Sequence, residues 1–198
     1  MKTRERKLVE TRYQLNGLIL LYAYLQRVFV HDRVGAGFPG AAARTGPDPI
    51  PGLLDGVGTA IKTFDKDAGL SAEDGKRLLE TTGSARSLMR AHLPRPDAAL
   101  PEQLASVAAA LYAEEHVNNG LVHLGDIFDP EVADQFRQRI PQFRTQVGVI
   151  TGYVGKVTGG EPLTGEENAQ LGSWFTNVTG SAAHIEQDFQ RIEQYLGT

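Results

Sequence analysis

The sequence contains no cysteine, and this absence excludes several classes of chemistry. Disulfide bonds, thiolate metal sites, cysteine-held iron–sulfur clusters and cysteine nucleophiles are all ruled out. The absence also removes any sign of an oxidising compartment, and we expect a cytoplasmic protein. The net charge of −4 is small, so the overall charge gives no reason to expect nucleic acid as a partner.

Long apolar runs are also missing. The segment from Leu15 to Leu25 is apolar and follows a basic start, but it is too short to span a bilayer. Glu5 and Glu10 interrupt the basic part, and no small-residue cleavage site follows. We therefore predict no transmembrane segment and interpret the run as the middle of a buried helix. A cleaved signal and a peripheral membrane anchor are the alternatives.

The familiar local motifs of enzymes do not occur in the sequence. A di-iron bundle needs Glu-x-x-His on two helices, and the chain has no such pair. Neither His-Glu-x-x-His nor Gly-x-Ser-x-Gly is present. We therefore predict that the protein is not an enzyme. A catalytic site whose residues converge only in three dimensions is the alternative, because acid–base pairs need no fixed spacing.

Apolar residues at helical spacing are abundant. They recur at steps of three and four, which lets a helix bury one face, and alternating strand patterns are nearly absent. Capping signals at Ser71 and Thr164, and the start at Pro130, help to set the boundaries. The predicted helices are at residues 4–33, 52–66, 72–92, 101–124, 130–158 and 165–196.

These elements predict an all-α fold: an antiparallel helical bundle of four long helices plus one or two short helices. A chain of 198 residues is enough for one sizeable core and hardly for two, so residues 1–198 are expected to form a single helical domain. Eleven of the residues 35–58 are Gly or Pro. This density predicts an irregular Gly/Pro-rich loop at residues 34–58, of a length that is often functional or poorly ordered.

Within that loop, Gly35, Gly37 and Gly40 spell the G-x-G-x-x-G pattern of dinucleotide-binding proteins. In that fold the glycines lie between a strand and a helix of a βαβ unit. Here a predicted helix precedes them and no βαβ unit follows. We interpret these glycines as part of the loop.

A group of polar residues on the helix near residues 101–124 is the candidate site. Tyr112, His116, Asn119 and His123 are spaced four, three and four apart, so they share one face of that helix. Upstream the same helix is apolar and rich in alanine. The change from apolar to polar residues along the helix indicates a polar pocket, a wet interface or an exposed helix end. A solvated helix end, whose histidines are hydrogen-bonded and bind no ligand, is the simpler interpretation.

Part of this segment resembles a known family. Ala113-x-x-His116-Val117-x-x-Gly120-Leu121 is similar to the segment around the haem-binding histidine of bacterial globins, and Trp174 lies in the last helix, where globins often carry tryptophan. The resemblance covers residues 113–121. It implies that His116 would ligate haem iron through its imidazole, and that Phe64 would pack on the haem.

Charge is unevenly distributed along the chain. Residues 1–12 carry a net charge of +3, whereas residues 114–134 hold six acidic residues and no Lys or Arg. Such asymmetry favours a complementary partner.

Our leading hypothesis is a non-enzymatic helical-bundle module that acts by binding another protein or by forming a homo-oligomer. The alternative is a cofactor-binding helical protein, with haem or a small apolar ligand near Tyr112, His116 and His123. The high Ala and Gly content is typical of a bacterial GC-rich genome.

Overall fold

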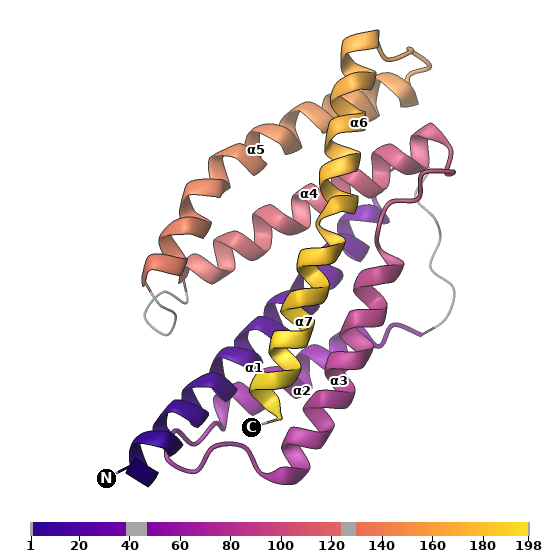
Figure 1. Ribbon diagram of the computed structural model, residues 1–198. Coiled ribbons are helices and arrows are strands. Elements are labelled where there is room, and N and C mark those ends of the chain that lie inside the picture. The colour runs from indigo at the N-terminus through magenta and orange to yellow at the C-terminus, as the bar shows by residue number, and fades with distance from the viewer. Residues whose placement is uncertain (1, 39–46, 124–129, 198) are drawn as a thin grey trace. The chain divides into compact units, whose positions relative to one another are not determined.

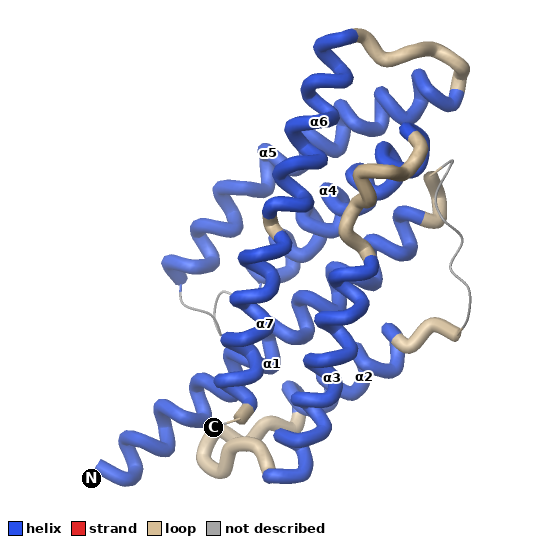
Figure 2. The backbone as a smooth tube through the Cα atoms, turned by 45° about the vertical axis from the view of Figure 1, so that its right-hand side comes forward, coloured by secondary structure: helices blue, strands red, loops and turns tan. Residues whose placement is uncertain are grey.

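Helices make up almost all of the described chain. The computed structural model describes residues 2–38, 47–123 and 130–197, and no strand occurs within these ranges (Figure 2). The all-α prediction is confirmed. The helices are α1 (Lys2–Gly35), α2 (Ile50–Lys62), α3 (Ala72–Ala91), α4 (Leu100–His123), α5 (Pro130–Thr158), α6 (Gly165–Gly180) and α7 (Ala182–Leu196).

The chain divides into two compact units, each built from segments that are separated in the sequence. Unit 1 comprises residues 1–26, 48–91 and 183–198, and unit 2 comprises residues 27–47 and 92–182. Helix α1 contributes to both units. Among the described residues, every helix falls short of the length and apolarity needed to cross a membrane.

Several helix ends lie where the capping residues place them. The Thr164 side chain accepts a hydrogen bond from the backbone N–H of Glu167, and the Glu167 carboxylate accepts one from the backbone N–H of Thr164. This reciprocal pair is the predicted capping box. Ser71 Oγ likewise accepts from the backbone N–H of Asp74 at 3.1 Å at the start of α3. Helix α5 stops before Gly160, whose φ of +82° suits glycine.

Helix α2 begins at Ile50 and ends at Lys62, so the helix predicted at residues 52–66 is confirmed over residues 52–62. The irregular backbone predicted for residues 34–58 is wrong over residues 34–35, which belong to α1, and over residues 50–58. The Asp48 carboxylate accepts from the backbone N–H of Ile50, and proline occupies the first turn, where no backbone donor is needed. An apolar stripe is then buried, which outweighs the cost of the glycines in the helix. The stripe consists of Ile50, Leu54, Val57 and Ala60. Residues 39–46 of the predicted loop lie outside the described ranges.

The last helix was predicted to be continuous, but it is divided between α6 and α7 at Ser181. Gly180 directly precedes this residue, and Ser181 Oγ donates to the backbone carbonyl of Val178 at 2.6 Å. A local side-chain bond of this kind competes with the regular helical ladder. The apolar spacing continues through the break, so it did not reveal the division. By contrast, α5 continues through Pro141.

The core of unit 1 is formed by α2, α3, α7 and the part of α1 up to Gln26. Helices α1 and α7 approach closely, because a Cβ added at Gly17 would lie 3.0 Å from Tyr195 Cβ. Arg86 of α3 forms ion pairs with Glu186 and Glu193 of α7. The largest fully buried side chains here include Leu18, Leu21, Leu25, Leu78, Phe189 and Ile192.

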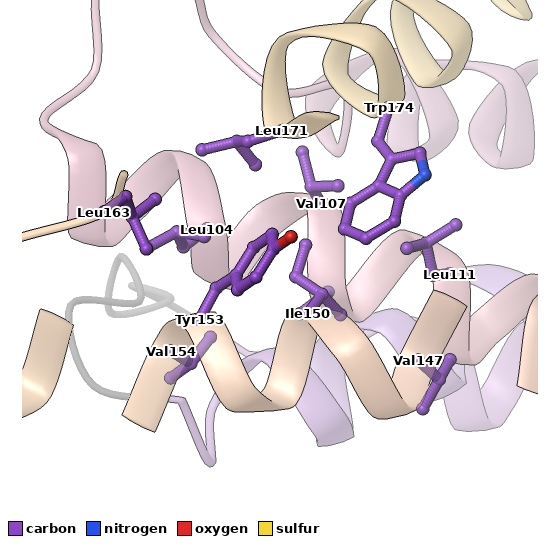
Figure 3. Packing of buried hydrophobic residues seen from close by; sticks show 11 residues of the cluster. Leu104, Val107, Leu111, Val147, Ile150, Tyr153, Val154, Leu163, Leu171 and Trp174 are labelled. Atoms are coloured by element: carbon purple, nitrogen blue, oxygen red, sulfur yellow. The ribbon is translucent and has the colours of Figure 1, made fainter. Parts of the chain in front are cut away.

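The core of unit 2 lies between α4, α5 and α6 (Figure 3). Helices α4 and α5 run side by side (Figure 1). The Tyr153 ring stacks on Trp174 with 5.9 Å between centroids, and Phe143 packs against the cluster while partly exposed. The side chain of Phe136, predicted to be buried on the same helix as Phe143, lies outside the described residues. The buried residues are Leu104, Val107, Ala108, Leu111, Val147, Ile150, Tyr153, Val154, Leu163, Leu171 and Trp174.

Replacement of Gly69 by alanine should destabilise unit 1. Gly69 has φ +76°, and an added Cβ would lie 2.6 Å from the Gln14 side-chain oxygen, which accepts from the backbone N–H of Leu70. We expect a loss of about 1–3 kcal/mol in the free energy of unfolding, measured by urea denaturation. Gly56→Ala is the control, because its Cβ meets nothing within 4 Å, and it should gain about 0.5–1 kcal/mol. Equal effects of the two substitutions would contradict this account.

Glu167 should make the stability of the protein depend on pH on the acid side. Its pKa is lowered first by the hydrogen bond from Lys156 and then by the backbone N–H of Thr164. A pKa below the unfolded value gives stability that is present above the unfolded pKa and lost as pH falls through the folded pKa. Glu167→Gln keeps a capping acceptor, so it should mainly flatten the acid side of the stability–pH curve. Glu166→Gln, in the same helical turn, should change the curve less.

Candidate metal site

Two histidines and one aspartate come together in unit 2. His31 and Asp32 lie near the end of α1, and His92 directly follows the last residue of α3. Each residue offers one ligand atom, and the three atoms all lie within 4.8 Å of one another. The described part of the chain thus brings together a donor set typical of a metal site, from two positions far apart in the sequence.

The helical repeat of α1 explains why two neighbouring residues face the same way. Val28 is fully buried, and His31 and Asp32 follow it by three and four positions, so both lie on the face that Val28 buries. The third donor is placed by the end of α3. His92 lies in a turn two residues before Pro94, which is buried and cannot continue the helix.

The imidazole of His31 carries a buried nitrogen without a partner. Nε2 is inaccessible to solvent and has no hydrogen-bond partner among the described residues. Burial lowers the pKa of His31 to about 3, together with the positive charges of His92 and Arg27, and a hydrogen bond with the backbone of Ser106 on α4 opposes the shift. The ring is therefore neutral near pH 7. With Nδ1 as the donor, Nε2 keeps a free lone pair, the form that ligates metals.

His92 and Asp32 form the more open side of the cluster. His92 Nε2 is hydrogen-bonded to Asp32 Oδ1, and the two side chains are 14% and 20% exposed. The His92 ring meets the His31 ring edge-on, with 4.7 Å between centroids. The site also lies at the C-terminal end of α1, where the helix dipole gives a partial negative charge that favours a cation.

Two imidazoles and a carboxylate form a chemically recognisable donor set. Imidazole suits zinc, iron, copper and nickel ions, whereas calcium and magnesium prefer sets made of oxygen. A hydrogen bond from the second ring nitrogen to a backbone carbonyl is the usual way in which proteins orient a ligating histidine. His31 has that arrangement through Ser106. The cluster can therefore hold a divalent transition ion, or serve as a His–Asp pair beside a neutral histidine.

The predicted site residues lie elsewhere on unit 2, along α4. His116 is exposed, and Asn119 and Tyr112 are partly buried, with the Tyr112 ring 6.1 Å from the ring of Phe38. The side chain of His123 lies outside the described residues. Within the described side chains, the structure does not bring Tyr112, His116 or Asn119 into the cluster of candidate metal ligands.

The residues that the globin resemblance involves do not all belong to the same unit. Trp174 is buried in the core of unit 2 against Tyr153. Phe64 is partly buried and belongs to unit 1, whereas His116 belongs to unit 2. Haem binding near His116 stays a prediction.

Sequence reasoning missed His31, Asp32 and His92 as a site. A signal was present in α1, because the apolar series Leu21, Leu25 and Val28 continues into His31 and Asp32 at helical spacing. The approach of His92 had no such signal, because it depends on how α3 ends.

The chain matches no protein-family model, no curated protein and no solved structure.

Proposed function

We propose that this protein binds a divalent transition-metal ion through His31, Asp32 and His92. The observation that carries the proposal is the approach of three ligand atoms to within 4.8 Å, with the buried Nε2 of His31 left without a partner in the described chain. A buried polar atom without a partner requires an explanation. Coordination of an ion would satisfy that nitrogen.

The donor set favours zinc, cobalt, nickel or iron ions over magnesium and calcium. His92 is 60 residues from Asp32 in the sequence. An ion bound to both would stabilise only the folded chain, because the ligands are brought together by folding. Binding is therefore expected to raise the unfolding temperature.

Addition of Zn²⁺ or Co²⁺ to the metal-stripped protein should test the proposal directly. At an ion concentration about 100 times Kd we expect the unfolding temperature to rise by about 5–10 °C. His31→Gln and His92→Gln should each weaken binding by at least about tenfold in calorimetric titration. His116→Gln is the matched control, since it removes an exposed histidine of the same unit. Equal affinities for all four proteins would refute the site.

A second candidate function is self-association or binding of a protein partner, supported by the first turns of α1. Residues 5–9 are exposed, and Leu8 and Val9 are each 51% exposed in a segment of positive charge. Exposed apolar side chains beside charge are a common feature of partner surfaces.

We also expect the helices to form the antiparallel bundle inferred from their apolar seams, and the protein to reside in the cytoplasm.

Light scattering after gel filtration should report the self-association. We expect the wild-type protein to form an oligomer at high concentration and Leu8→Glu/Val9→Glu to stay monomeric, because two charges would have to be buried in the contact. Val149→Glu is the control, since Val149 is a 36% exposed apolar residue on α5. A wild-type protein that stays monomeric at every concentration would exclude self-association.

A further inference from the structure

We propose that an ion held by His31, Asp32 and His92 keeps a coordination position for a small anion from solvent, such as azide or inorganic phosphate. This inference rests on the metal binding proposed above and extends it from the ion to a ligand of the ion. It distinguishes a site that exchanges ligands from one that serves only to hold the fold together.

The number of donors favours an incomplete coordination sphere. The described cluster supplies three ligand atoms. Zinc sites with a purely structural role usually have four protein ligands, whereas sites with three keep a position for water or another ligand. Two histidines and a carboxylate leave open positions on octahedral ions as well. The donor set is therefore typical of a site that takes up an external ligand.

The three groups differ in their access to solvent. The Nε2 atom of His31 is closed to solvent, whereas the side chains of Asp32 and His92 remain 20% and 14% exposed. An ion among these three groups would have protein on the His31 side and a partly open side at Asp32 and His92. Solvent ligands can approach from that open side.

Charge determines the sign of the ligand. A divalent ion beside the single carboxylate of Asp32 leaves an excess of positive charge, because imidazole ligands of a metal ion are neutral. Arg27 precedes His31 by one helical turn, and its positive charge acts on the His31 ring. Its side chain is only 13% exposed and forms an ion pair with Glu114. A positive, partly buried site favours a small anion.

The absorption spectrum of the cobalt-loaded protein should test this inference. Cobalt bands in the visible range respond to a change of ligand, so azide should change them in a saturable way and inorganic phosphate should compete. A spectrum that stays constant under azide and phosphate, while Co²⁺ binds fully, would overturn the open position and leave the metal site intact. Failure of Co²⁺ to bind would overturn both proposals.

A test of the role of Arg27 in anion binding requires a variant that does not leave a buried charge unpaired. Arg27→Gln/Glu114→Gln removes both partners of the ion pair, so it avoids the penalty of breaking it. We expect this double variant to bind azide about tenfold more weakly with little change in Co²⁺ affinity. Arg33→Gln is the matched control, since Arg33 is an exposed arginine on the same helix. Unchanged azide affinity in the double variant would remove Arg27 from the proposal.

Discussion

Helix α1 buries one apolar stripe over residues 18–28, and this stripe determines where the polar residues that follow it lie. Leu18, Leu21, Leu25 and Val28 are all completely buried. Because a helix is rigid over this length, the direction of each later side chain follows from those of the earlier ones. His31 and Asp32 are therefore carried onto the buried face. The hydrophobic effect that orients the helix thus also desolvates the histidine.

Burial of His31 removes water from its ring nitrogens, and each nitrogen then needs another hydrogen-bond partner or a ligand. An unpaired buried acceptor costs about 1–3 kcal/mol, and Nε2 of His31 is such an acceptor within the described chain. A hydrogen bond with the Ser106 backbone orients the ring. Together these effects produce a preorganised lone pair, which is useful only if something binds it. A transition ion matches both the donor type and the partial negative charge at the end of α1.

The sequence predicted those parts of the fold that depend on local chemistry. The capping box at Thr164 and Glu167 formed as expected, because both partners lie within one helical turn. The division at Ser181 was not predictable from apolar spacing, since the spacing continues on both sides of it. Helix α2 was predicted to start too late, because glycine and proline count against a helix unless their positions on its exposed face and in its first turn are known.

The candidate site was harder to predict for the same reason. Half of it is local to α1, where His31 and Asp32 extend an apolar stripe. The other half depends on His92 reaching Asp32 across 60 residues, and helical periodicity carries no information about such an approach. The histidines that local spacing did single out, at positions 116 and 123, share a helix face but not a described cluster.

The position of the site within unit 2 gives the proposed ion a physical role beyond ligand binding. Unit 2 is assembled from residues 27–47 and residues 92–182, and the donors come from both segments. His31 and Asp32 lie close to the start of the first segment, and His92 begins the second. Closing a chain between distant residues costs conformational entropy. An ion shared by the two segments would offset part of that cost, so its affinity and the stability of unit 2 would be linked.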